Sequence, residues 1–472
     1  MTDQKSSSRW IALFVLCAGM LMIILDQTIV NVALPAIKAD LGFTQPGLAW
    51  VINAYLIAFG GLLLLAGRLG DLIGRKRVFL VGLTAFTLAS LLCGASGTPE
   101  MLIISRFLQG IGGAMATAVT LGMIVTMFPK PAEQARAIGV FSFVAAAGAS
   151  IGLLAGGILT QALNWHWIFL VNLPIGIAAI ALATKLIDND RGIGLREGAD
   201  ILGAVLVTGA LMLGVFAIVA ENAIAGAVAV AALIGFLIRQ AKAAKPLLPL
   251  RIFKSRNVSG ANAIQILMIA GMFGMFFLGT LYMQLVLGYD ALQIGLAFLP
   301  VALAIGGLSV GLSARLAGRF GERNVLLAGL TLILAGLILF TRAPVDGSYL
   351  TDLLPVMLLL GIGAGVSFPM MMTLAMSGAT DSDAGLASGL VNTTAQVGGA
   401  LGLAVLATLS TARTGALRVA GETEAQALTS GFHLAFGVGA GLVLLAIVLA
   451  ATVLRPVPES APAEEPEYEL VG

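Results

Sequence analysis

Charged side chains are scarce in this sequence of 472 residues. Only 11% of the residues are Asp, Glu, Lys or Arg, whereas 59% are hydrophobic, and an ordinary globular chain carries about 25% charged residues. A water-soluble core cannot hide so much apolar side chain, so lipid has to be the solvent for much of the surface. In hydrocarbon every backbone amide must be hydrogen-bonded internally, which favours helices. The composition therefore predicts an all-α polytopic membrane protein.

Residue types that carry redox, metal or nucleotide chemistry are also rare. The two cysteines, Cys17 and Cys93, lie in long apolar runs, so neither a disulfide framework nor a metal site is suggested. No Gly-Lys pair occurs, which excludes a Walker loop for binding phosphates. The two histidines, His166 and His433, fit no metal-binding helix pattern. We therefore expect no enzyme, metal or cofactor, and the net charge of +2 gives no reason to expect a nucleic acid partner.

Apolar runs of about 20 residues predict fourteen membrane spans. Only Glu221 and Asn222 separate the seventh run from the eighth, so twelve or thirteen spans is the alternative count, and Glu221 is expected in a solvated turn. The expected spans are 10–34, 48–68, 77–97, 101–126, 137–160, 166–184, 200–220, 223–239, 259–285, 292–316, 322–342, 351–375, 386–412 and 431–454.

The distribution of Lys and Arg predicts the orientation. Basic residues near span ends accumulate on the cytoplasmic side. If the N-terminus is cytoplasmic, most of the 26 basic residues fall inside. Arg106 lies within a span, and the basic residues outside are Lys38, Arg342, Arg413 and Arg418. We therefore expect a bacterial inner-membrane protein with both termini in the cytoplasm.

An internal repeat divides the chain into two halves. The stretch Arg68-Leu-Gly-Asp-Leu-Ile-Gly-Arg-Lys-Arg-Val78 is echoed by Arg315-Leu-Ala-Gly-Arg-Phe-Gly-Glu-Arg-Asn-Val325, each between the second and third spans of its half. Such repeats are typical of secondary transporters. The expected units are a cytoplasmic N-terminus (1–9), a six-helix bundle (10–190), an inserted helix pair (200–239), a cytoplasmic linker (240–258), a second six-helix bundle (259–455) and a disordered tail (456–472).

Two ionisable residues lie well inside expected spans. Asp26 is in the first span, where a charged carboxylate costs about 2.5–3.5 kcal/mol on insertion scales. Intramembrane acids are candidate proton-coupling groups; the alternative is a carboxylate that only hydrogen-bonds helix ends or Asn31. Arg106, in the fourth span, either biases a nearby carboxylate or only snorkels or clamps the first span.

Glycines mark two further candidate features. Around Gly67, Asp71, Gly74 and Arg75 we expect a tight turn with a buried Asp71 near a helix N-terminus and a charge pair to Arg75; alternatively, the basic cluster only fixes topology. A stripe of small residues in the fifth span predicts close helix packing, with a sliding surface as a further use. The stripe consists of Gly148, Gly152, Gly156 and Gly157.

Polar and aromatic side chains of the spans could line a central substrate cavity, although each could equally be a helix-to-helix hydrogen bond or ordinary packing. These candidates are Asn31, Asn53, Tyr55, Gln109, Tyr282, Gln284, Phe368, Met371, Asn392 and Gln396.

Four motifs resemble the major facilitator superfamily, and within it the fourteen-span drug:proton antiporters, over residues 10–455. The loop Gly67–Arg77 looks like the superfamily's signature between spans two and three, and Leu25–Pro35 is similar to the first-span motif of the fourteen-span exporters. Arg106–Ala114 looks like the fourth-span motif assigned to proton coupling, and Asn164–Gly176 resembles the sixth-span motif, with His166 where Arg is usual.

The resemblance implies two six-helix bundles that alternate access to a central cavity, with Asp26 and Arg106 in proton coupling and the Asp71 loop as a cytoplasmic latch. One departure is Leu153, which follows Gly152 where the fifth-span motif has proline. The expected function is proton-coupled efflux of lipophilic, often cationic drug-like compounds by a monomer. The alternatives are a dedicated exporter of one endogenous metabolite or antibiotic, and a non-transporting sensor or lipid scramblase.

Overall fold

The computed structural model describes residues 2–190, 192–194, 198–377 and 384–455, and every regular element in this part of the chain is a helix. The expected tail, 456–472, lies outside the described residues. The helices of the first half and the inserted pair are α1 (Thr2–Leu41), α2 (Gln45–Ile73), α3 (Arg75–Gly94), α4 (Pro99–Met127), α5 (Pro131–Ala162), α6 (Trp167–Leu170), α7 (Asn172–Leu186), α8 (Ile201–Val219) and α9 (Ala223–Lys242). Those of the linker and second half are η2 (Leu250–Lys254), α10 (Arg256–Leu285), α11 (Ala291–Gly307), η3 (Leu308–Leu312), α12 (Ser313–Phe320), α13 (Glu322–Phe340), η4 (Tyr349–Leu353), α14 (Leu354–Met376), α15 (Ala384–Val419) and α16 (Glu424–Thr452).

The expected spans coincide with these helices. Among the described residues, 12 helices are long and apolar enough to cross a membrane, and two shorter apolar helices lie at 151–162 and 291–307. The second of these is continued by η3 and α12. Glu221 lies exposed in the turn between α8 and α9 with φ of 50°, so the seventh and eighth spans are separate helices. About fourteen spans is therefore correct.

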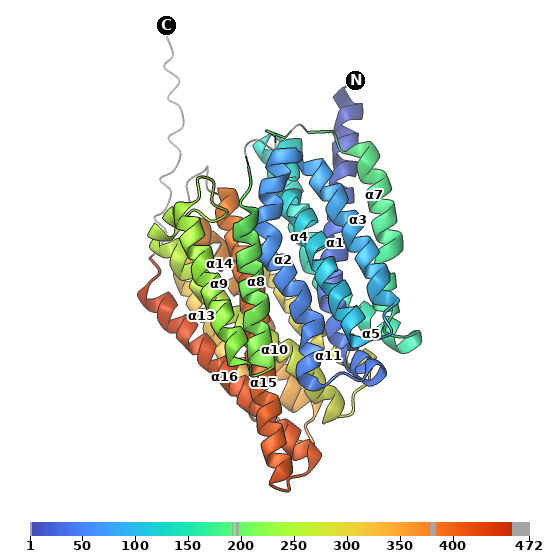
Figure 1. The fold of residues 1–472 in the computed structure, drawn as a ribbon, viewed down its shortest axis with the longest axis vertical. Coiled ribbons are helices and arrows are strands. Elements are labelled where there is room, and N and C mark those ends of the chain that lie inside the picture. Colours follow the sequence, from blue (N-terminus) through green and yellow to red (C-terminus); the bar gives the residue numbers. More distant parts are fainter. Residues whose placement is uncertain (1, 191, 195–197, 378–383, 456–472) are drawn as a thin grey trace.

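Two bundles and an inserted helix pair make up the fold (Figure 1). In one bundle α3 and α2 pack on α4, and α1 packs on α5 and α7; in the other α10, α15 and α16 pack together and α14 packs on α11 and α13. The bundles meet along two seams, α2 against α15 and α5 against α11. Helix α8 packs on α9 and on both α2 and α15, so the inserted pair covers the first seam. Its α9 exposes Ile224, Ile234 and Ile238, as expected of a surface in lipid.

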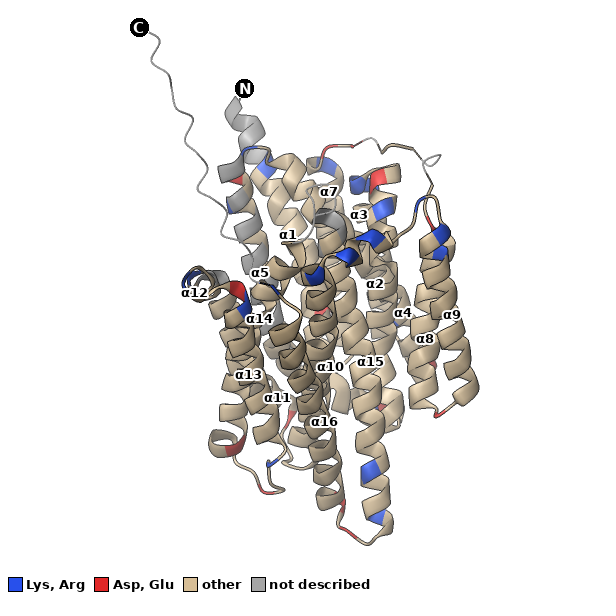
Figure 2. Cartoon of the chain, turned by 90° about the vertical axis from the view of Figure 1, so that its left-hand side faces the viewer, with Lys and Arg blue, Asp and Glu red and all other residues tan. Residues whose placement is uncertain are grey.

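Figure 2 shows Lys and Arg gathered at the end of the molecule that carries the N-terminus and α12. We call this end the basic face, and the end with the α15–α16 turn the opposite face. Helix α15 has 36 residues, a length of about 54 Å at 1.5 Å per residue, and so extends beyond a hydrocarbon core of about 30 Å. The α15–α16 hairpin therefore projects from the opposite face (Figure 1).

The two repeated loops are built alike. Gly74 and Gly321 occupy corresponding positions and have φ of 102° and 78°, a region that favours glycine. Two residues further on, Lys76 donates from Nζ to the carbonyls of Thr184 (3.0 Å) and Ile187 (2.5 Å) at the end of α7. At the corresponding place Arg323 donates to the carbonyls of Ala450 and Ala451 near the end of α16. In each bundle a cation thus satisfies the last carbonyls of the sixth span.

Asp200 anchors the inserted pair at the basic face. Its buried carboxylate caps α8 through the Gly203 N–H (2.9 Å) and accepts from Arg239 Nε (3.0 Å) and Gln240 Nε2 (2.8 Å) of α9. Gln240 Oε1 accepts from the Leu248 N–H of the linker. Burial alone would raise the pKa of Asp200, but these hydrogen bonds outweigh burial and hold the pKa below its usual value. One carboxylate therefore joins α8, α9 and the linker.

Asp200→Ala is expected to destabilise the protein by about 1–3 kcal/mol, because a helix cap and two further hydrogen bonds are lost. Since the folded pKa is depressed, this contribution is present above the ordinary Asp pKa of about 3.9 and is lost as pH falls through the folded value. The melting temperatures of the wild type and the variant should differ at pH 7 and converge below about pH 4. Asp188→Ala, at an exposed acid of the same face, is the control, and an equal effect in both variants would contradict the assignment.

Candidate functional site

A fully buried ion pair joins α1 to α4. Arg106 Nη1 donates to Asp26 Oδ2 at 2.5 Å, and the side chains of Arg106 and Asp26 are 2% and 0% exposed. Both charged groups are buried away from bulk water, so each charge depends on the other for stabilisation. The structure therefore brings together the two ionisable residues that the sequence places well inside spans.

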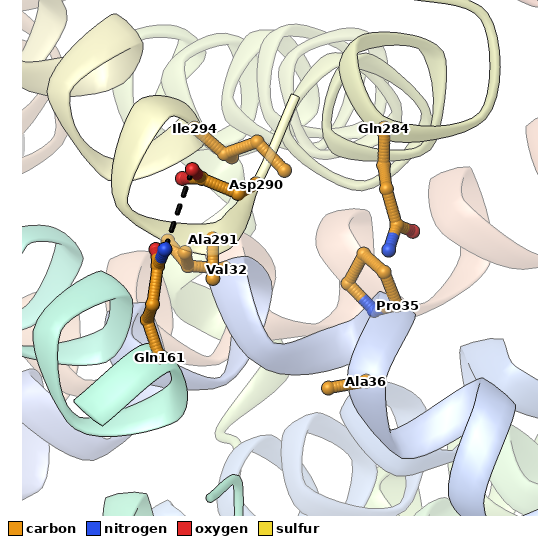
Figure 3. A pocket seen from close by; sticks show the side chains of 8 residues that line it. All are labelled: Val32, Pro35, Ala36, Gln161, Gln284, Asp290, Ala291 and Ile294. Atoms are coloured by element: carbon orange, nitrogen blue, oxygen red, sulfur yellow. Dashed lines mark hydrogen bonds between the residues drawn. The ribbon is translucent and has the colours of Figure 1, made fainter. Parts of the chain in front are cut away.

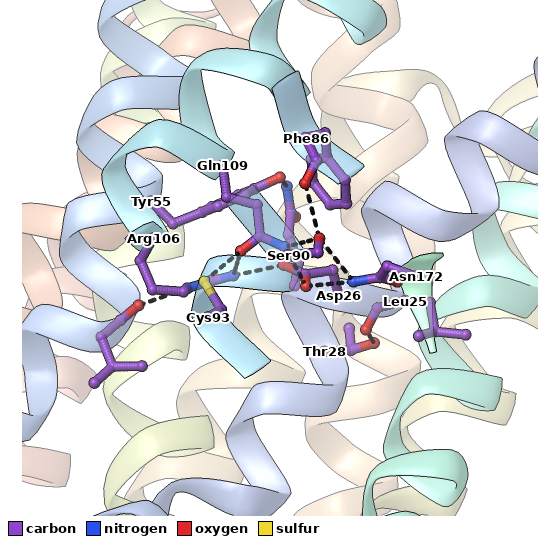
Figure 4. Close-up of polar contacts among 12 residues, drawn as sticks. Leu25, Asp26, Thr28, Tyr55, Phe86, Ser90, Cys93, Arg106, Gln109 and Asn172 are labelled. Atoms are coloured by element: carbon purple, nitrogen blue, oxygen red, sulfur yellow. Dashed lines mark hydrogen bonds and ion pairs between the residues drawn. The ribbon is translucent and has the colours of Figure 1, made fainter. Parts of the chain in front are cut away.

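The side chains of Gln109, Asn172 and Ser90 form a hydrogen-bond network around the carboxylate of Asp26 (Figure 4). Asp26 Oδ1 accepts from Gln109 Nε2 (2.7 Å) and from Asn172 Nδ2 (2.9 Å) of α7. Gln109 also accepts from Arg106 Nη1 at 2.6 Å and donates to Ser90 Oγ of α3 at 2.8 Å. All of these residues are buried. The carboxylate is thus held by donors from two helices besides its own, and α3 is tied to it through Ser90.

The guanidinium of Arg106 has partners beyond the carboxylate. Its Nε donates to the Val51 carbonyl of α2 at 2.9 Å, and its Cζ lies 4.4 Å from the centre of the Tyr55 ring. Tyr55 OH accepts from Gln27 Nε2 at 3.2 Å, and Gln27 is the neighbour of Asp26 in α1. Arg106 therefore has a carbonyl, an amide and an aromatic face as partners besides the Asp26 carboxylate.

The expected cavity residues of the N-terminal bundle lie in three different surroundings. Tyr55 and Gln109 belong to the Asp26 network, whereas Asn31 donates from Nδ2 to carbonyls of its own helix, at Gln27 and Thr28. Asn53 is fully buried, and neither polar atom of its side chain has a hydrogen-bond partner among the residues that the structure describes. Asn53 is therefore a polar side chain of α2 that could still form hydrogen bonds.

The expected cavity residues of the C-terminal bundle do not converge on one place. Tyr282 OH donates to the Pro344 carbonyl at 2.5 Å, and its ring packs edge-on against Phe340 and Phe432 inside the bundle. Gln396, on α15, faces α2, since a Cβ on Gly60 would lie 2.7 Å from the Gln396 Cβ. Three others lie on α14 and α15: Phe368 is half-buried, Met371 buried and Asn392 exposed, while Gln284 of α10 lines a pocket described below.

In the loop that contains Gly67, Asp71, Gly74 and Arg75, the position of the aspartate differs from the expectation. Asp71 is exposed, not buried, and pairs with Arg75 at 3.3 Å. The carboxylate that caps α3 is Asp190, which accepts from the N–H groups of Arg75 (2.5 Å) and Lys76 (3.0 Å). Arg75 also donates to the Gly122 carbonyl of α4 at 3.0 Å, and Gly67 has open space around it. These partners belong to the N-terminal half, so the loop braces its own bundle.

The four glycines of α5 face two partners. A Cβ on Gly148, Gly152 or Gly156 would meet α1, and at Gly156 the Ile29 carbonyl would lie 2.7 Å away. A Cβ on Gly157 would instead lie 2.7 Å from the Ala291 carbonyl of α11, in the other bundle. Three of these glycines therefore allow α5 to pack closely on α1, whereas Gly157 faces α11 across the seam between the bundles. Without a proline after Gly152, α5 runs uninterrupted from Pro131 to Ala162.

The α5–α11 seam is closed toward the opposite face. A Cβ on Gly295 of α11 would lie 2.7 Å from the Leu153 carbonyl of α5. Nearby, Gln161 of α5 donates to Asp290 Oδ2 at 3.4 Å and accepts from the Leu292 N–H at 3.3 Å. A pocket of about 310 Å³ adjoins this contact, and Gln284 faces Pro35 across it (Figure 3). One amide side chain thus clamps the N-terminus of α11.

Comparison with protein families agrees with this architecture. The model of the Major Facilitator Superfamily matches residues 16–403. The chain belongs to the major facilitator superfamily.

Several bacterial members of the superfamily are similar over nearly the whole chain. The puromycin resistance protein pur8 of Streptomyces alboniger is 38% identical over 96% of this chain and 93% of its own length. The cephamycin export protein CmcT of Amycolatopsis lactamdurans is 37% identical over 97% and 95%. A solved facilitator structure, the bacterial homolog of the human lysosomal transporter Spinster in an inward-facing, unoccupied conformation, shares the fold with a TM-score of 0.68. It is 16% identical and the alignment covers 94% of this chain and 98% of that one.

Four residues of this facilitator's network, loop and seam were not singled out from the sequence: Ser90, Asn172, Asp190 and Gln161. Asn172 stands within the sixth-span motif, but a motif does not show which way a side chain points. Asp190 caps a helix that begins 115 residues earlier, and no local pattern reveals that. A search for polar residues in every span, regardless of motif, would have found Asn172 and Ser90.

Arg106→Met should lower the stability of the facilitator by about 3–5 kcal/mol, because it leaves the Asp26 carboxylate buried and unpaired. Adding Asp26→Asn to that variant removes the unpaired charge and should restore much of the loss. Thermal unfolding of the purified chain in detergent measures both effects. Arg77→Met, at an exposed cation, is the control. A double variant no more stable than Arg106→Met would show that the two residues are not coupled.

Proposed function

We propose that this facilitator exports lipophilic, often cationic drug-like compounds across the cytoplasmic membrane in exchange for protons. The observation that carries the proposal is the fully buried Asp26 carboxylate held by Arg106 Nη1 at 2.5 Å. Similar proteins are named for resistance to puromycin and lincomycin and for export of cephamycin, which supports efflux of such compounds. The concentration of Lys and Arg at the basic face supports a cytoplasmic position for that face.

Competition for one carboxylate supplies the proposed coupling. Protonation of Asp26 removes its charge and releases Arg106 to its remaining partners, Val51 and Gln109. A substrate cation favours the charged carboxylate, so proton and cation stabilise different states of the same site. Asn172 of α7 and Gln109 of α4 both donate hydrogen bonds to Asp26 of α1. A change in the charge of Asp26 therefore alters the contacts of three helices.

Alternating access is proposed to run through the two seams. In this structure Gln161 and the Gly157 and Gly295 contacts hold α5 against α11 toward the opposite face. Release of substrate to the outside requires this contact to part. In the proposal the loop of Gly67, Asp71, Gly74 and Arg75 keeps the cytoplasmic side of the N-terminal bundle rigid, as a latch, during that movement.

The second candidate is a dedicated exporter of one endogenous metabolite or antibiotic. It is favoured by the names of two relatives, the cephamycin export protein and a probable actinorhodin transporter of Streptomyces coelicolor. A non-transporting sensor or lipid scramblase on the same fold predicts no dependence on a proton gradient, so the experiment below distinguishes it as well.

Everted membrane vesicles should accumulate a fluorescent lipophilic cation when they contain the wild type and carry a proton gradient. Asp26→Asn should reduce this accumulation by roughly tenfold or more, in the range expected when a coupling free energy of about 1–3 kcal/mol is lost. Collapse of the gradient should abolish accumulation by the wild type. Fluorescence in the vesicles is the measurement.

The control for that experiment is Asp188→Asn, at an exposed acid away from the network. If wild-type vesicles show no gradient-dependent uptake across a panel of cations and neutral drugs, the multidrug proposal fails and the dedicated exporter is preferred. If Asp26→Asn transports as well as Asp188→Asn does, transport does not run through Asp26.

A disulfide across the α5–α11 seam should stop transport. Gln161→Cys and Asp290→Cys place thiols on the two residues whose longer side chains now meet, and oxidation of a pair that comes within disulfide reach should lock the opposite face closed. Vesicle uptake should fall on oxidation and return on reduction, while each single-cysteine variant stays insensitive. The native Cys17 and Cys93 are buried and free, so they need not be removed. Unchanged transport by the cross-linked chain would contradict opening of this seam.

A further inference from the structure

A second pocket lies at the opposite face, between the α1–α2 turn and the α15–α16 hairpin. Its volume is about 340 Å³, and it is lined from the N-terminal half by Lys38 and Gln45 and from the C-terminal half by Arg418 and Glu424. Leu285 and Leu428 contribute apolar walls. The pocket therefore exists in this form only while the two halves meet at this end.

The pocket has an excess of hydrogen-bond donors. The half-buried Lys38 ammonium has no hydrogen-bond or ion-pair partner among the residues that the structure describes. Gln45 Nε2 is buried and also without a partner in this part of the chain. Arg418 is paired with Glu424. Two cations therefore face one carboxylate, and an amide N–H₂ group nearby remains to be satisfied.

Like charges from opposite halves make this pocket costly when it is empty. Lys38 lies at the end of α1 and Arg418 at the end of α15, so closure brings two positive charges into one pocket. An anion between them would turn this repulsion into two attractions and would satisfy Gln45. The ligand chemistry that matches Lys, Arg and an amide donor is an oxyanion, a phosphate or carboxylate.

We propose that this pocket binds an oxyanion, a phosphate or carboxylate, between the two halves and so stabilises the conformation that is closed at this face. The adjoining Leu285 and Leu428 can take a hydrocarbon attached to the anion, and α15 extends past the hydrocarbon core at this end, where lipid phosphates lie. The same chemistry therefore comes from two sources, a free anion or a lipid headgroup. Binding rests on the geometry alone, and only the assignment of this face to the outside rests on the proposed function.

The test is thermal unfolding of the full chain in neutral detergent, titrated with inorganic phosphate or with short-chain phosphatidate at constant ionic strength. Either ligand should raise the melting temperature, because it binds the folded state. Lys38→Gln should bind roughly tenfold more weakly, through loss of a charge-assisted hydrogen bond. Without ligand, Lys38→Gln should be at least as stable as the wild type, because the repulsion from Arg418 that it removes exceeds the attraction to Glu424 that it also removes. A variant that simply misfolds would be less stable.

Arg342→Gln, at an exposed cation of the same face, is the matched control and should respond as the wild type does. Equal affinity for phosphate and phosphatidate would show that the free oxyanion is sufficient. Tighter binding of phosphatidate, lost in Lys38→Gln, would show that the occupant is a lipid headgroup. No stabilisation by either ligand, or equal stabilisation of the wild type and Lys38→Gln, overturns the proposal. None of these outcomes depends on transport, so a failed vesicle assay would leave the binding result intact.

Discussion

The Asp26 carboxylate and the Arg106 guanidinium are stable in the N-terminal bundle only as a pair, because burying either charge alone costs several kcal/mol. Among the ion pairs of the described residues, this is the one with both side chains almost fully buried. Its geometry requires α1 and α4 to stay in register, and Asn172 and Ser90 extend the requirement to α7 and α3. Four helices of the bundle are thus joined through one buried ion pair, whose carboxylate is the proposed proton-coupling group.

The two halves share a loop design but differ in their interiors. Lys76 and Arg323 cap corresponding helix ends, which shows that the repeat extends from sequence to hydrogen bonding. The C-terminal bundle is filled instead by aromatic packing, with Tyr282 among Phe340 and Phe432. Among its described residues this bundle has no buried Asp, Glu, Lys or Arg, so protonation should affect it little. The asymmetry is therefore consistent with a proton-sensitive N-terminal bundle that moves against a more passive partner.

The spans could be predicted from the sequence because membrane insertion imposes a length and a hydropathy that every helix must meet. Asp26 and Arg106 stood out for the same reason, since charges inside a span are rare. The other members of the network were harder to predict: Asn172 and Ser90 are uncharged, and only the rotation of α7 and α3 turns Asn172 toward Asp26 and Ser90 toward Asn172 and Gln109. The expected burial of Asp71 was wrong, because residue type does not reveal which neighbour a side chain faces.

Opposing forces act at the face where the halves close. Backbone contacts at Gly157 and Gly295 and the Gln161 clamp favour closure, because any larger side chain or lost hydrogen bond would weaken them. Lys38 and Arg418 oppose closure, since they bring like charges into one pocket. When two conformations are nearly balanced, a differential affinity of a few kcal/mol is enough to exchange their populations. In the proposed mechanism a proton at Asp26, or an anion at Lys38, supplies that difference in free energy.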